Sequence, residues 1–295
     1  MATNFSTSNV KQTVVERFFE GIHSVSEQWA QAYDYRRNDI ADLRLSPISG
    51  VSEIGQWDPN SDLPVQELEA LTPQSVAYTS YGVQVRVNKY DAKDVPESTT
   101  VLPQRIGTAV ASTYSKRAAT VLNNAFSTAT TSYDGLALCA TNHTVKGGST
   151  RSNKLTTALD ASAIMAGIAL FRKWVDYQGL KFDVVAMGGF YLVVPPDLEE
   201  AAGQAIGSAV TNDQMQLNMA GSYGIDTIVW NQLTDTNNYF LVSKAMSPLI
   251  FWERSAPDLQ IDIDEDSKAG KYSVDFAIAP AVNAIPDGIV GYEVA

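Results

Sequence analysis

The last third of the sequence constrains the fold most strongly, because strand-like apolar runs follow one another there with a single helix among them. The first two runs are Phe182–Met187 and Phe190–Val194, after which Pro195-Pro196-Asp197 ends the strand and starts a helix. Four further strand-like runs follow: Gly224–Trp230, Tyr239–Lys244, Leu249–Arg254 and Lys271–Pro280. One βα unit followed by consecutive strands predicts an α+β fold.

The last of these runs alternates apolar and other side chains, as a strand does when one face packs on a core. Its apolar face consists of Tyr272, Val274, Phe276 and Ile278. We expect this strand to support the longest helix of the chain.

Upstream, helices are expected where apolar residues recur at helical spacing. The longest covers Ile106–Phe126, nearly six turns or about 30 Å. Another begins at Asp160, a favourable N-cap, and ends with Gly179 at the C′ position. Near the N-terminus the same spacing runs over Val14–Ile22 and continues through residues 24–42.

Residues 46–71 are rich in Pro, Gly, Asn and Asp, which break any long element and indicate an extended, polar stretch. The segment that follows, residues 77–87, reads as an amphipathic strand, with Tyr81 and Val85 on one face and Arg86 on the other. A long arm that returns as such a strand predicts a protruding β-hairpin. We expect this hairpin to lie on a neighbouring molecule, because a compact domain rarely leaves such a piece unsupported.

Charge and composition bound the function. The chain has 21 Lys and Arg against 33 Asp and Glu, a net charge of −12, which argues against direct nucleic-acid binding. Only 18% of the residues are charged, so neighbouring subunits are expected to cover much of the surface. With one cysteine, no secretory signal and no apolar run of membrane-spanning length, the protein is expected to be made and used in the cytosol.

Cys139 and His143 are the one thiol and imidazole close in sequence, which suggests a Cys-His nucleophile. They stand in a loop without an obvious orienting Asn or Asp or an oxyanion signal, so an ordinary loop is the preferred interpretation. Since His23 is the only other histidine, a structural zinc site has too few ligands.

The turn Asp262-Ile263-Asp264-Glu265-Asp266 places carboxylates at the first, third and fifth positions of a calcium-binding loop. The sixth position is Ser267 instead of glycine, and the twelfth is Ser273 instead of glutamate. We therefore interpret the turn as a solvated hairpin tip, or else as part of an ion pair between subunits. No metal or cofactor is expected.

Neither the glycine pairs nor the tryptophans form a ligand-binding motif. Gly203, Gly207 and Gly147-Gly148 match no phosphate or dinucleotide loop. The tryptophans are spaced as core or interface anchors, and none alternates with basic residues as a nucleic-acid stacking platform requires.

Four stretches in a fixed order resemble the major capsid proteins of tailed bacteriophages with the Hong Kong 97 fold, closest to phage Mu-type major head subunits. They are Asp134–His143, Leu159–Leu180, Tyr191–Glu199 and the series from Gly224–Trp230 to Val294. The resemblance spans about residue 46 to the C-terminus.

The resemblance implies a division of the chain into the parts of that family. These are an N-terminal arm (1–45), an extended E-loop hairpin (46–95), a peripheral domain (96–181) with its spine helix at 106–126, an axial domain (182–245) and a return to the peripheral domain (246–295). Candidate contacts between subunits are Trp57, Arg86, Asp262, Asp264 and Asp266.

The resemblance further implies a non-enzymatic protein that self-assembles into hexamers and pentamers of an icosahedral shell around double-stranded DNA. Its expected partners are other copies, a separately encoded scaffold, a portal and a decoration protein, and DNA packaged without sequence-specific binding; no membrane is involved. The expected place is the virion capsid, assembled in the bacterial host cytoplasm. Some relatives cross-link an E-loop lysine to an asparagine next door, and Lys89 and Lys93 are in range.

Two alternatives stay open at this point. An encapsulin-like cargo shell would share the fold but enclose proteins instead of DNA. A hydrolase built on Cys139 and His143 belongs to a different class. It would be excluded if Cys139→Ser left the fold and particle formation intact and the unaltered protein had no hydrolytic activity.

Overall fold

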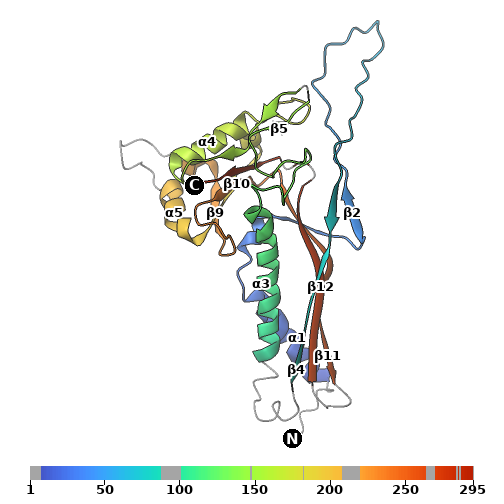
Figure 1. Ribbon diagram of the computed structural model, residues 1–295, viewed down its shortest axis with the longest axis vertical. Helices are drawn as coiled ribbons and strands as arrows, with labels where there is room; N and C mark the ends of the chain where they lie inside the picture. Colours follow the sequence, from blue (N-terminus) through green and yellow to red (C-terminus); the bar gives the residue numbers. More distant parts are fainter. Residues whose placement is uncertain are drawn as a thin grey trace.

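The structure of the protein is a computed structural model with an elongated part and a more compact part (Figure 1). It describes residues 8–87, 101–146, 148–181, 183–207, 220–263, 270–283, 285 and 287–294. The following residues named above therefore lie outside the described residues: Lys89, Lys93, Gly147, Asp264, Glu265, Asp266 and Ser267.

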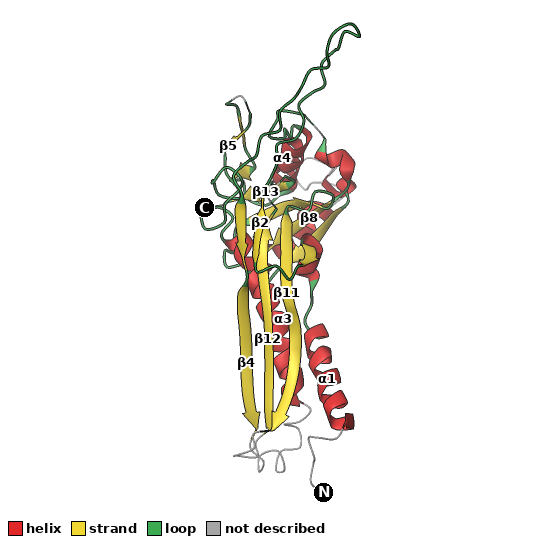
Figure 2. Ribbon diagram, turned by 90° about the vertical axis from the view of Figure 1, so that its right-hand side faces the viewer, coloured by secondary structure: helices red, strands yellow, loops and turns green. Residues whose placement is uncertain are grey.

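The elongated part is built on a four-stranded sheet in the order β1 (Asp34–Arg37), β11 (Leu249–Ile263), β12 (Gly270–Val282) and β4 (Thr79–Val87). β11 and β12 are antiparallel strands of 15 and 13 residues. At about 3.3 Å per residue the sheet is roughly 40 Å long. Figure 2 shows the three longest strands side by side, with two helices behind them.

These helices are α1 (Ser8–His23) and α3 (Val101–Asn123), which cover one face of the long sheet. They cross at two glycines, because a side-chain carbon on Gly107 would overlap the carbonyl oxygen of Phe18, and one on Gly21 would overlap that of Gln104. The alternation in β12 has the expected effect, since its four apolar side chains are buried in the core beneath α3.

The compact part holds a five-stranded sheet and a core of its own. Its strand order is β7 (Lys154–Leu155), β13 (Ile289–Tyr292), β10 (Tyr239–Ser243), β8 (Phe190–Val194) and β9 (Ile225–Val229). The helices α4 (Ala161–Arg172) and α5 (Glu199–Gly207) pack on this sheet. Phe171 of α4 stacks on Phe190 of β8 with ring centroids 5.0 Å apart.

Two small hairpins complete the strands. β2 (Asp42–Leu45) pairs with β3 (Gln74–Ala77), and the loop between them, residues 46–73, extends far from the body of the molecule (Figure 1). β5 (His143–Thr144) pairs with β6 (Thr150–Arg151). The 3₁₀ helices are η1 (Gln28–Ala32), η3 (Val184–Met187), η4 (Pro196–Leu198) and η5 (Ala220–Tyr223). Among the described residues, no helix is both long and apolar enough to cross a membrane.

Several local predictions are confirmed. Asp160 caps α4, because its carboxylate accepts a hydrogen bond of 2.6 Å from the backbone N–H of Ala163. The long helix is present as α3, displaced a few residues toward the N-terminus. The strands expected over Phe190–Val194 and in the last third are present, and β11 continues well beyond its expected end at Arg254.

Other predictions are wrong because tertiary contacts override local spacing. The helix expected over residues 24–42 is replaced by η1 and β1, since β1 pairs in parallel with β11. The helix from Asp160 ends at Arg172, and Gly179, with φ +87°, belongs instead to a tight turn. A strand expected over Phe182–Met187 is the 3₁₀ helix η3 in its described part.

The expected protruding hairpin is also partly wrong. Its returning strand, β4, pairs with β12 along nine residues and so belongs to the chain's own sheet. What protrudes is the preceding loop 46–73. The sequence of an amphipathic strand does not reveal whether the strand that it pairs with belongs to the same chain or to another chain. Only the observed pairing of β4 with β12 decides this.

Candidate assembly surfaces

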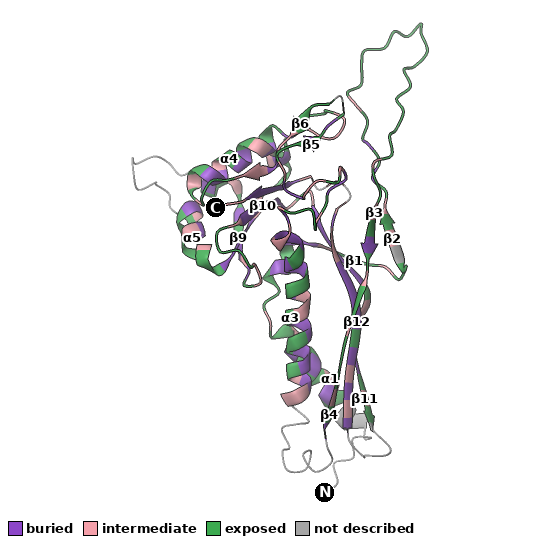
Figure 3. Cartoon of the chain, viewed as in Figure 1, coloured by how far each residue is buried: buried purple, intermediate pink, exposed green. Residues whose placement is uncertain are grey.

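Loop 46–73 carries an unusual concentration of exposed apolar side chains. Ile54 is 85% exposed and Val65 is 88% exposed. The other large apolar residues that are exposed here are Ile48, Val51, Trp57, Leu63 and Leu68. Figure 3 shows the loop as almost entirely exposed, in contrast to the two cores. Exposed apolar side chains gathered on one loop in this way mark a site of interaction with another molecule.

The same loop is acidic. It contains five carboxylates, Glu53, Asp58, Asp62, Glu67 and Glu69, and the sequence has no Lys or Arg between Arg44 and Arg86. A partner that covers this loop must therefore combine apolar and cationic groups.

Internal hydrogen bonds give the loop a defined shape. At its base, the backbone N–H of Ser49 donates to the carbonyl of Glu69 at 2.8 Å. At its tip, the indole N–H of Trp57 donates to the carbonyl of Ser61 at 2.9 Å. Trp57, one of the predicted contacts, thus orders the tip and still exposes 41% of its side chain.

Two further predicted contacts lie at the opposite end of the long sheet. The register places Asp262 of β11 opposite Lys271 of β12, and Lys271 opposite Arg86 of β4. Asp262 and Arg86 are both exposed. The structure therefore places these two residues on either side of Lys271 in three adjacent strands, at the end of the sheet away from loop 46–73 (Figure 1).

Cys139 does not have the surroundings of a nucleophile. It is 1% exposed, beside Phe126 and Gly291. Burial raises the pKa of its thiol, and the nearby charge of Lys154 offsets only part of this. The thiol therefore stays protonated at neutral pH, and among the described residues no hydrogen bond joins it to His143.

His143 is held by partners that the sequence did not reveal, so the expectation of no orienting Asp or Asn is wrong. Its Nδ1 lies 2.9 Å from the Asp134 carboxylate, and its Nε2 lies 3.1 Å from the Asn153 amide oxygen. That oxygen also accepts from the Ala140 N–H, while the Asn153 amide nitrogen donates to the Leu138 carbonyl. Both ring nitrogens therefore lie within hydrogen-bond distance of side-chain oxygens.

The electrostatics of Asp134 agree with this arrangement. Burial by itself raises the pKa of the carboxyl group, but hydrogen bonding to His143, its charge, and two backbone N–H groups outweigh burial. The net pKa lies below its ordinary value. The cluster ties together a loop and leaves neither ring nitrogen free for catalysis, and sequence spacing alone offered no signal for Asn153.

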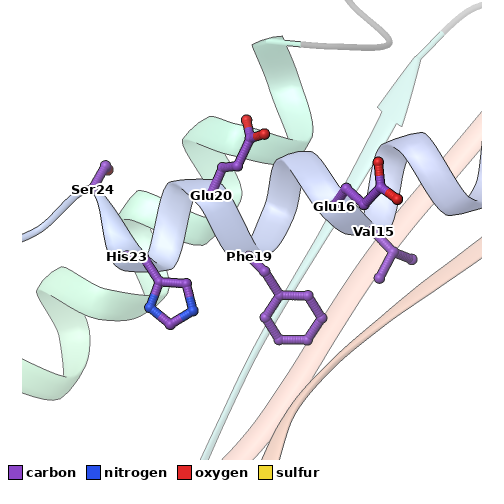
Figure 4. A pocket seen from close by; sticks show the side chains of 6 residues that line it. All are labelled: Val15, Glu16, Phe19, Glu20, His23 and Ser24. Carbon is purple, nitrogen blue, oxygen red and sulfur yellow. The ribbon is translucent and has the colours of Figure 1, made fainter.

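Side chains on the outer side of α1 form a shallow hollow of about 600 Å³ (Figure 4). Val15, Phe19 and His23 point to one side of the helix, while Glu16 and Glu20 point to the other. The inner side of α1 packs on α3, so this outer face is open to a further partner.

Comparison with known proteins identifies a family that the sequence matches. The sequence matches the family described as phage capsid protein over residues 79–291. No curated protein matches the sequence.

Solved structures share the fold at low sequence identity. The virus-like particle from Pyrococcus furiosus aligns with a TM-score of 0.56 and 11% identity, covering 96% of this chain and 98% of that one. The mature capsid of bacteriophage PhiM1 aligns with a TM-score of 0.60 and 12% identity, covering 90% and 86%. The procapsid of bacteriophage JBD30 aligns with a TM-score of 0.53 and 13% identity, covering 97% and 74%. The predicted α+β fold of the Hong Kong 97 type is confirmed.

Proposed function

The chain belongs to the phage capsid protein family, and from this premise we propose how it builds its shell. It is a major capsid protein, a structural component of an icosahedral virion shell and not an enzyme. We propose that copies assemble into hexamers and pentamers that enclose double-stranded DNA, in a head of the phage Mu type.

One observation carries this proposal: the exposed apolar and acidic surface of loop 46–73. Seven large apolar side chains on a loop with no core of its own are stabilised only when another molecule covers them. Because all copies are identical, a loop that lies on the next copy creates a head-to-tail contact, and such contacts close into rings. Each contact can be modest, because every subunit is held by several neighbours.

The remaining parts are assigned by the resemblance and belong to the proposal. They are the arm (1–45), the E-loop (46–95), the peripheral domain (96–181 and 246–295) and the axial domain (182–245). Trp57 is proposed to anchor the E-loop contact. Arg86 and Asp262, with Asp264 and Asp266 beyond the described residues, are proposed to meet neighbours at the tip of the peripheral domain.

The acidic composition fits a container that repels DNA, so that the genome is packaged without sequence-specific binding. A separately encoded scaffold, a portal and a decoration protein are the proposed further partners. Assembly is proposed to take place in the cytoplasm of a bacterial host.

The test substitutes the two most exposed apolar residues of the loop with charges, Ile54→Asp together with Val65→Asp. Both side chains are almost fully exposed, so the subunit should keep its melting temperature and circular dichroism. Negative-stain microscopy should show particles for the unaltered protein and for the matched control Ile54→Leu with Val65→Ile, but none for the charged pair. Normal particles from the charged pair would rule out the loop as an assembly contact.

A cargo shell is the second candidate, because the virus-like particle from Pyrococcus furiosus shares the fold over nearly its whole length. The contents of particles purified from their natural source separate the two. Nuclease-protected DNA supports the phage head, whereas a stoichiometric protein cargo without DNA supports the alternative.

A further inference from the structure

Glu253 is a buried carboxylate on the long sheet. Glu253 is 5% exposed and lies on β11, on the face of the sheet toward α1 and α3. The hydroxyl group of Tyr114 donates to it at 3.0 Å, and Tyr35 also hydrogen-bonds to it. Hydrogen bonds stabilise a buried carboxylate only in part, because a buried charge is costly without a counter-charge.

Among the described residues no cation forms an ion pair with Glu253, although the charge of Arg37 acts on the neighbouring hydroxyl groups of Tyr35 and Tyr114. Arg37 stands opposite Glu253 in the pairing of β1 with β11, but its side chain is exposed and forms no ion pair with Glu253 among the described residues. His23 and Glu27 face the same cavity, and neither is bonded to Glu253. The carboxylate thus has room for a cation that arrives from outside the chain.

A cavity of about 350 Å³ leads to this carboxylate. Its walls come from α1, η1, β1, α3 and β11, and include four aromatic side chains: Phe19, Trp29, Tyr35 and Tyr114. Phe19 and His23 line both this cavity and the shallow hollow on α1 in Figure 4, so the two form a continuous surface. Largely apolar and aromatic walls with a buried carboxylate suit a long aliphatic side chain with a cationic end.

Lysine has this shape, and a second copy of the chain offers unpaired lysines. Within the described residues, four exposed lysines form no ion pair with a carboxylate: Lys116, Lys146, Lys173 and Lys181. We propose that in the shell this cavity receives a lysine side chain of a neighbouring copy, with its ammonium group against Glu253 and its alkyl chain against the aromatic walls. This inference rests on the proposed self-assembly.

Zero-length cross-linking of shells tests the contact directly. Particles are assembled from equal amounts of ¹⁴N- and ¹⁵N-labelled subunits and treated with a water-soluble carbodiimide. The reagent activates the carboxylate, the lysine amine displaces it to form an amide, and the carbodiimide leaves as its urea, having taken up the water that is lost. Trypsin then releases the peptide Ala245–Arg254, in which Glu253 is the only carboxylate side chain.

The expected product joins this peptide to a lysine peptide of the other isotope, which only two different copies can form. Links of Glu253 confined to peptides of the same isotope would overturn the proposal. Since a filled cavity can exclude the reagent, a substitution supplies an independent readout.

Glu253→Gln removes the charge but keeps an oxygen that accepts from Tyr114. The isolated subunit should keep its melting temperature, while the subunit concentration needed for particle formation should rise at least tenfold. Asp258→Asn, an exposed carboxylate on the same strand, should leave this threshold unchanged. An unchanged threshold in Glu253→Gln refutes the lysine contact but leaves self-assembly intact, whereas the absence of particles from the unaltered protein refutes both.

Discussion

The substitution Gly107→Ala tests the packing of α1 on the long helix α3. An added side-chain carbon would overlap the carbonyl oxygen of Phe18 and lie 2.9 Å from the backbone nitrogen of Ile22. Ordinary carbon–oxygen contacts are about 3.3 Å or longer, so α1 must move by on the order of 1 Å. The obstacle is backbone, which no change of side-chain rotamer relieves.

The cost follows from what α1 buries. Val14 and Phe18 are essentially inaccessible, and burial of each is worth about 1.5–3 kcal/mol, so complete detachment costs about 3–6 kcal/mol. The higher intrinsic helix propensity of alanine compared with glycine stabilises the helix by about 1 kcal/mol and offsets part of this cost. We expect Gly107→Ala to lower the free energy of unfolding by about 2–5 kcal/mol.

Urea unfolding of unassembled subunits, followed by circular dichroism, measures this change. Gly203→Ala is the matched control, because Gly203 is also in a helix but its added carbon would meet nothing within 4 Å. The control should be more stable than the unaltered protein, by up to about 1 kcal/mol. If Gly107→Ala behaves like this control, the close crossing of the two helices is refuted.

Three further outcomes are expected. The lowered pKa of Asp134 contributes stability that is present above the ordinary carboxyl pKa of about 4 and is lost as pH falls through the folded-state pKa. Asp134→Asn should therefore be less stable than the unaltered protein at pH 7, with a difference that shrinks below about pH 4 in thermal unfolding; a constant difference would contradict the ion pair with His143. Asp160→Ala removes the cap of α4 and should cost about 1 kcal/mol in urea unfolding, whereas no loss would show that the bond to Ala163 is not stabilising. Cys139→Ala should leave particle formation intact in electron micrographs, and its abolition would show that this buried thiol has a role in assembly.

Features with a strong local cause were predictable from the sequence. The alternation along β12 follows from the period of a strand, and the cap at Asp160 follows from its carboxylate next to free N–H groups. The extended loop is predictable from its Pro and Gly residues, which break regular elements.

Features that depend on contacts between segments far apart in the sequence were not predictable from the sequence. Residues 34–37 form a strand because the edge of β11 is available to them, and their own spacing carries no trace of this. The burial of the Glu253 carboxylate is not predictable from the sequence either, since a glutamate in a strand is usually a solvated residue. Asp262 and Arg86 are more than 170 positions apart in the sequence. They lie on either side of Lys271 only because of the register of three strands.

The sequence by itself therefore determined the α+β class, the extended loop, the long helix and the lack of a catalytic motif, because each of these depends on residues close together in the chain. Only the tertiary structure decided that β4 belongs to the chain's own sheet, that His143 is bound on both sides, and that α1 meets α3 at two glycines. All three features have the same physical reason. Each depends on a hydrogen bond or a close contact between distant segments, and the spacing of residues along the chain does not encode the geometry of such contacts.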